Sequence, residues 1–161
     1  MIAATRSRVP EESTGLGFAA GDGVGFRLLA QAATLPNNGS YTSDVAFDPT
    51  NPNTVYLSSV APSATLSHLW KSTNFGASWT VIETGLPAGV PVNAIVPDPI
   101  TSSTLYAATH LGVYASLDGG ATWTRYGAGL PLVNVMDLQV LSDRSLMRIC
   151  TFGRGVWEIV P

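Results

Sequence analysis

The sequence has few charges, one cysteine and no long apolar run. Only 12% of its residues are charged, against about 25% in ordinary soluble proteins, and its single lysine, Lys71, excludes the clustered basic surface that nucleic-acid binding needs. The single cysteine, Cys150, excludes an intrachain disulfide, and its apolar neighbours predict a buried thiol. Runs of about 18 apolar residues and a signal peptide are both missing from the sequence. These absences predict a soluble protein with no nucleic-acid or membrane partner, cytoplasmic as written or derived from a secreted protein.

The residues that are present favour one all-β domain. The 161 residues are 45% hydrophobic, enough for a single core, and 16 glycines and 11 prolines indicate many turns. No stretch keeps a helical period over three turns.

Two segments of the chain are internal repeats. Asp48-Pro49 and Thr54-Val55-Tyr56 recur 50 positions later as Asp98-Pro99 and Thr104-Leu105-Tyr106, whereas WKSTNFGASW at 70–79 recurs 44 positions later as YASLDGGATW. The difference predicts a six-residue insertion in the first copy, around 61–66. Each copy contains four short runs rich in Val, Thr, Tyr and Trp, at 45–47, 54–60, 69–72 and 79–82, then at 94–96, 104–109, 113–116 and 123–126. Four strands in 44 to 50 residues are typical of a β-propeller blade.

Each predicted blade contains a motif that resembles the Asp box. The segments 72–79 (STNFGASW) and 116–123 (SLDGGATW) are similar to Ser-x-Asp-x-Gly-x-Thr-Trp, which is found in sialidases, sortilin-type receptors and xyloglucan-cleaving glycosidases. Asn74 departs from the pattern but keeps a side-chain oxygen that can accept backbone N–H groups. The resemblance implies an Asp-box (BNR-repeat) propeller in which the motif is a structural turn closed by a core tryptophan.

A third unit begins at Val135 and includes strands near 146–151 and 155–158, but it lacks a fourth strand. Leu86 and Leu130 follow Trp79 and Trp123 by seven residues, and Leu35 follows Leu28 by the same spacing. Residues 26–30 are therefore predicted to be an orphan fourth strand.

The predicted domain is half of a propeller. It comprises a flexible tail over 1–22 and a propeller half over 23–161, containing the orphan strand 26–30, blades 44–83 and 92–127, and a partial blade 134–160. Known propellers close with about four to eight blades, so three blades' worth of strands predicts a homodimer that forms a six-bladed ring with exchanged N-terminal strands.

The starts of the innermost strands are expected to meet at one tunnel mouth. Asp44 and Asp137 occupy equivalent positions, with Asn93 between them, and carboxylates grouped without nearby cations take up protons or bind a cation. Hard oxygen ligands would suit calcium, so Asp44, Asn93 and Asp137 form a candidate Ca²⁺ site. The structural alternative is that both aspartates cap strand-start turns and face water.

The same face carries other candidates. His110 is a candidate general base beside catalytic Asp44 and Asp137, because histidine titrates near neutral pH. Arg154, His68 and Tyr41 are candidate substrate-binding residues, each with a packed or solvated loop role as the alternative.

Two functions stay open at this stage. The first is a hydrolase with a metal-assisted site at the mouth, acting on an ester, phosphoester or glycoside; a glycosidase that uses Asp44 and Asp137 as a pair is a variant of it. The sialidase arginine triad and Tyr–Glu pair find no match here. The second is a non-catalytic propeller module that binds a glycan or protein ligand, or a fragment of a larger secreted propeller.

Overall fold

Three antiparallel sheets follow one another along the chain in the computed structural model, which describes residues 35–36, 41–63 and 65–161. The first sheet contains β1 (Thr42–Phe47), β2 (Val55–Ser59), β3 (Leu69–Ser72) and β4 (Thr80–Val81). The second contains β5 (Val92–Pro97), β6 (Leu105–Thr109), β7 (Gly112–Ser116) and β8 (Thr124–Arg125). The third contains β9 (Val135–Val140), β10 (Met147–Thr151) and β11 (Gly155–Ile159).

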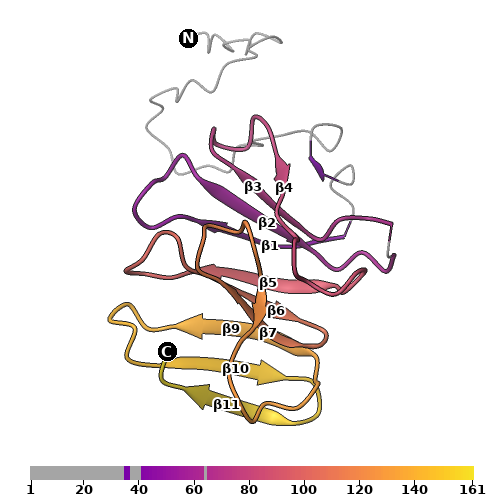
Figure 1. Cartoon of the computed structure of the whole chain (residues 1–161), viewed down its shortest axis with the longest axis vertical. Helices are drawn as coiled ribbons and strands as arrows, with labels where there is room; N and C mark the ends of the chain where they lie inside the picture. The colour runs from indigo at the N-terminus through magenta and orange to yellow at the C-terminus, as the bar shows by residue number, and fades with distance from the viewer. Residues whose placement is uncertain (1–34, 37–40, 64) are drawn as a thin grey trace, which may run out of the picture.

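Within each sheet, the strands pair in chain order by antiparallel ladders. Figure 1 shows the sheets stacked in sequence, with β5–β8 between the other two. The first strands lie side by side, because β5 contacts both β1 and β9. The predicted all-β fold of propeller blades is confirmed. The N-terminal predictions, the tail 1–22 and the strand 26–30, lie outside the described residues.

The fourth strands are shorter than the sequence suggested. Trp79 and Trp123 precede β4 and β8 instead of starting them, and Trp123 inserts between the first two sheets with 2% of its surface exposed. Its indole Nε1 donates a 2.6 Å hydrogen bond to the Ile82 carbonyl of the preceding blade. Gly85 makes room for this approach, because a Cβ at Gly85, whose φ is +96°, would lie 2.3 Å from the Trp123 carbonyl oxygen.

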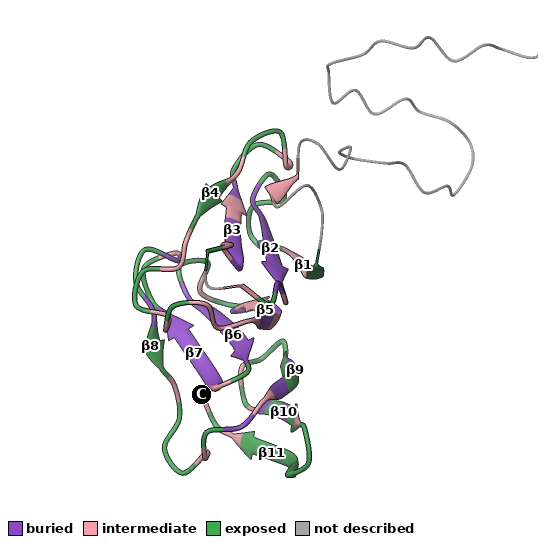
Figure 2. Cartoon of the chain, turned by 90° about the vertical axis from the view of Figure 1, so that its right-hand side faces the viewer, coloured by how far each residue is buried: buried purple, intermediate pink, exposed green. Residues whose placement is uncertain are grey.

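Each pair of neighbouring sheets shares a continuous apolar core. The second sheet contributes to both cores, with Leu105 and Ala107 facing the first sheet and Tyr106 and Ala108 facing the third. This alternation along β6 explains why β6 is buried throughout. Figure 2 shows that β2, β6 and β7 are buried and that β3 is mostly buried, whereas β11 is largely exposed.

The prediction that Cys150 is buried is wrong. Its thiol is exposed, because Ile149 takes the side of β10 that faces the second sheet and Cys150 takes the opposite side. An apolar local sequence identifies a strand, but it does not say whether another sheet covers both faces of that strand.

The turns that resemble Asp boxes have the hydrogen bonds expected of them. The Asp118 carboxylate accepts the Thr122 amide at 2.8 Å and the Thr122 hydroxyl at 2.6 Å, and Asn74 Oδ1 accepts the Ser78 amide at 2.9 Å. These bonds hold the pKa of Asp118 down at about 2. The Gly119 amide also donates to the Ser103 carbonyl in the turn between β5 and β6, which places both kinds of turn at one edge of the blade. That edge is opposite to the predicted mouth.

The position of Trp123 predicts a large loss of stability on truncation. Trp123→Ala should lower the free energy of unfolding by about 3–5 kcal/mol, because it leaves a cavity between two sheets. Urea denaturation measures this loss. Leu117→Ala, in the same turn and 71% exposed, is the control and should change stability by less than about 0.5 kcal/mol. Equal stability of the two variants would contradict this packing role.

Candidate functional site

Asp44 and Asp137 occupy the same position in two blades. Asp44 pairs with Ser58 across the first sheet, and Asp137 pairs with Cys150 across the third, in the register in which Ala94 pairs with Ala108 in the second. All three positions lie near the start of the first strand of their blade. The predicted gathering of strand-one starts at one end of the sheets is therefore present.

Asp44 is a half-buried carboxyl that bridges two blades. One oxygen accepts the Val45 amide at 2.8 Å, and the other accepts the Ile95 amide of β5 at 3.1 Å. The pKa of Asp44 is raised above 3.8, chiefly because burial disfavours the charged form, although the two amides oppose the shift. The charge of Asp137 raises it slightly further. The two carboxyls therefore interact across the second blade.

Asp137 and Asn93 have different surroundings. The Asp137 side chain is exposed, and one of its oxygens accepts the Leu138 amide at 2.8 Å. The Asn93 amide nitrogen donates to Asn134 Oδ1 at 2.7 Å and to the Val135 carbonyl at 2.6 Å. Asn93 therefore joins the second blade to the third, as the equivalent Ser43 joins the first to the second through the Val92 carbonyl at 2.6 Å.

The expected calcium site has few candidate ligands. Within residues 35–36, 41–63 and 65–161, no group of three or more His, Cys, Asp or Glu side chains could surround a metal ion. Two carboxyls and one amide oxygen fall short of the six to eight oxygens that calcium takes in proteins.

The two histidines are neighbours on this face, but only one is accessible. His68 is 2% exposed, its Nε2 lies 2.9 Å from the Ala61 carbonyl, and its Nδ1 lies 3.8 Å from Glu83. A ring enclosed in this way stabilises the inserted loop and has no surface left for a substrate. His110 is exposed in the turn between β6 and β7, and its pKa is lowered by burial and then by the nearby His68. The lowered pKa of His110 favours its neutral form more than that of an ordinary histidine.

Arg154 and Tyr41 are exposed and are not joined to the aspartates by any described contact. Arg154 lies in the turn between β10 and β11, where its carbonyl accepts the Trp157 Nε1 at 2.9 Å. Tyr41 has 54% of its surface exposed and a φ of +61°, and its carbonyl accepts the Val60 amide.

An ion pair between the second and third blades, with a buried aspartate and a partly exposed arginine, was missed by the sequence analysis. Asp98 is fully buried and lies 3.1 Å from the Arg144 Nε, and it also accepts the Tyr106 hydroxyl at 3.2 Å. The Asp-Pro pair marked the repeat in the sequence but gave no sign of an ion pair. Arg144 has no counterpart in the other repeats, so no pattern could have pointed to it.

Comparisons with solved structures confirm the propeller fold. A glycoside hydrolase of family GH74 from Niastella koreensis is 25% identical, with a TM-score of 0.60, over 72% of this chain and 19% of that chain. The GH74 xyloglucanase from Xanthomonas campestris is 17% identical, with a TM-score of 0.57, over 76% of this chain and 21% of that chain. YCF48, in a structure bound to D1 peptide, is 16% identical, with a TM-score of 0.55, over 74% of this chain and 37% of that chain.

This chain spans about a fifth of the length of the GH74 enzymes that it matches. No family model matches the sequence, and no curated protein does. In the described residues, no helix has the length and apolarity that crossing a lipid bilayer would require.

The geometry predicts that Asp44 titrates above 3.8 and responds to Asp137. Asp137→Asn should lower the Asp44 midpoint by removing a neighbouring negative charge, yet leave it raised because burial remains. Carboxyl ¹³C NMR titration measures this midpoint, with Asp143→Asn at an exposed turn as the control.

Because folding disfavours the charged form of Asp44, its contribution to the stability of the fold is fully present below about pH 3.8 and is lost as pH rises through its folded pKa. An Asp44 midpoint that is unchanged in Asp137→Asn would show that the two carboxyls do not interact.

Proposed function

We propose that this chain is part of a hydrolase-type propeller that acts on a glycoside through Asp44 and Asp137. The observation that carries the proposal is the contrast between two equivalent carboxyls, one half-buried with a raised pKa and one exposed. Glycoside hydrolysis uses two carboxyl groups in different protonation states, and the one that keeps its proton to higher pH is suited to be the acid. The fold similarity to a GH74 enzyme at 25% identity supports this class of reaction.

The residues have distinct roles in the proposed reaction. Asp44 donates its proton to the glycosidic oxygen as the bond between that oxygen and the anomeric carbon breaks. Asp137 takes a proton from the water that attacks the anomeric carbon, so the water oxygen forms the new bond. The proton balance is then restored by solvent. Tyr41, which precedes β1, and Arg154, in the turn between β10 and β11, are both exposed and are proposed to contact the sugar.

Calcium assistance, with His110 as the base, is the alternative hydrolase mechanism that the sequence suggested. It would act on an ester or phosphoester through a metal held by Asp44, Asn93 and Asp137. In the described residues, no group of three or more His, Cys, Asp or Glu side chains could hold a metal ion, and so the paired carboxyls have the better support.

A second candidate function is a non-catalytic module that binds a glycan or protein at the mouth. It is favoured by the number of polar groups on this face that already bond within the chain. Ser43, Asn93 and His68 all do so, as polar groups with a structural role do.

Assays of the full chain test the proposed function. The substrates are aryl glycosides and xyloglucan, because one structural neighbour is a xyloglucanase. Asp44→Asn and Asp137→Asn should each lower kcat/KM by about a hundredfold to ten-thousandfold, whereas Asp143→Asn should not change it. Activity should fall as pH rises through the raised pKa of Asp44, because the acid must carry its proton.

Three outcomes would overturn the paired-carboxyl mechanism. Full activity in both variants would place the chemistry elsewhere. Turnover that EDTA abolishes, with bound calcium lost in the two variants, would support the metal-assisted mechanism instead. Glycan binding without turnover would support the non-catalytic module.

A further inference from the structure

The two interfaces between consecutive sheets are built from the same positions of the repeat. Residues of the first interface have counterparts in the second about 42 to 50 positions later. The matching pairs are Tyr56 and Tyr106, Leu69 and Val113, Val92 and Val135, Ile95 and Leu138, Leu105 and Met147, and Ala107 and Ile149. The second interface should therefore need every side chain that the first one has.

One side chain of the first interface has no counterpart in the second. Trp123 is buried against the first sheet, but the described part of the third sheet contains no fourth strand to supply its equivalent. Trp157 shows the consequence, because it is 38% exposed whereas the equivalent Tyr114 is 7% exposed. Among the described strands, β11 pairs only with β10, which leaves the edge that a fourth strand would occupy without a described partner.

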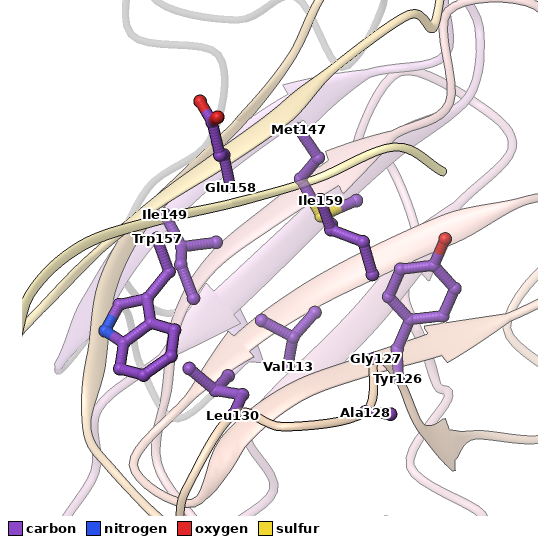
Figure 3. A pocket seen from close by; sticks show the side chains of 10 residues that line it. All are labelled: Val113, Tyr126, Gly127, Ala128, Leu130, Met147, Ile149, Trp157, Glu158 and Ile159. Carbon is purple, nitrogen blue, oxygen red and sulfur yellow. The ribbon is translucent and has the colours of Figure 1, made fainter.

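A partly open apolar cavity of about 60 Å³ lies where the missing tryptophan would be. Its walls include Tyr126, Leu130 and Trp157, which are the counterparts of the Trp123 neighbours Ile82, Leu86 and Tyr114. In Figure 3 the rings of Trp157 and Tyr126 lie at opposite sides of the cavity, with Val113 and Leu130 between them. The cavity can therefore hold one apolar side chain from a strand that pairs with β11.

The other end of the molecule indicates which segment supplies that side chain. Leu35 and Pro36 line a cavity with Trp70 and Trp79, as Leu86 packs against the cluster of Tyr114 and Trp123. This match sets the register of the preceding residues. Leu28 comes seven residues before Leu35, as Trp79 comes seven before Leu86, so by sequence Leu28 is the counterpart of Trp79.

Trp79 gives a second indication of the same register. Its Nε1 is buried and has no hydrogen-bond partner among the described residues, although the equivalent Trp123 Nε1 donates to the Ile82 carbonyl. In the register set by Leu35, the counterpart of Ile82 is residue 31. A fourth strand that leads into Leu35 would therefore place a carbonyl where Trp79 needs one.

The strand that precedes Leu35 cannot be the fourth strand of the third sheet of its own chain. Leu69 faces the second sheet, and Trp70, the next residue of β3, faces the opposite way. Leu35 and Pro36 line a cavity together with Trp70, so these two residues lie beyond the outer face of the first sheet. The vacant position is on the third sheet, at the other end of the stack (Figure 1).

We infer that residues 26–30 of a second copy of this chain pair with β11 and insert Leu28 into the cavity between the second and third sheets. Exchange in both directions gives a two-fold symmetric ring of six four-stranded blades. The same ring covers Val45 and Phe47 on the outer face of the first sheet, which are 55% and 53% exposed. It also covers Cys150, whose counterpart Ala108 is fully buried.

Light scattering on the full chain tests the exchange. The intact protein should have a mass near twice 16.8 kDa, and Leu28→Asp should shift it to the monomer by placing a charge in the apolar cavity. Leu29→Asp is the matched control, because the equivalent positions Thr80 and Thr124 are exposed, and it should remain a dimer. Cys150 should react with a thiol reagent at least tenfold faster in Leu28→Asp than in the intact protein.

A cross-link identifies the copy that supplies the strand, even if Leu28→Asp fails to fold. The Trp123 amide donates to the Thr84 carbonyl at 2.8 Å, and the counterparts of these residues are Leu28 and Ala128. Oxidised Leu28→Cys/Ala128→Cys, in a Cys150→Ser background, should therefore run as a covalent dimer on a denaturing gel. A cross-linked monomer, a monomeric intact protein, or a mass of three or more chains would each overturn the inference.

Discussion

Each blade of this chain has two apolar faces and can bury neither of them alone. The ladders within a sheet satisfy the backbone, but the side chains of β2, β3, β6 and β7 need a neighbouring sheet on each side. The second sheet has such neighbours and is the best buried. The first and third sheets each have one, and their outer faces leave Val45, Phe47 and Val156 exposed. Stability, the geometry of the mouth and any association of chains all follow from how these faces are covered.

The polar residues at the mouth depend on the same stacking. Ser43 and Asn93 bond to equivalent carbonyls in the next blade, and Asp44 accepts an amide from the next blade. These bonds form only where another blade follows. Asp137 is in the third blade, after which no further blade is described, and its one hydrogen bond within the described part of the chain is the local one from the Leu138 amide. The difference between the two carboxyls arises from position in the stack, since their places in the repeat are the same.

The repeat in the sequence was sufficient to predict the strands and the blades. Its displacements aligned the first strands correctly and placed Asp44 and Asp137 at one end of the sheets, because pairing order and alternation are local properties. The burial of His68 and the ion pair between Asp98 and Arg144 were not predictable in this way. His68 is enclosed against Ala61 of the insertion, which has no second copy to compare, and Arg144 occurs in one blade only. Cys150 was misplaced because the number of sheets that cover a strand is a property of the assembly.

The two proposals meet at Asp137. In a closed ring, the first blade of the second copy follows the third blade, so its Val45 amide occupies the place that Ile95 has beside Asp44. Ring closure would then bury Asp137 as β5 buries Asp44, and two pairs of carboxyls would face one axis. Burial and like-charge repulsion both favour the protonated form of a carboxyl. Hydrolysis of a glycoside needs two carboxyls in different protonation states, so the division of roles between Asp44 and Asp137 would depend on the association of the two chains.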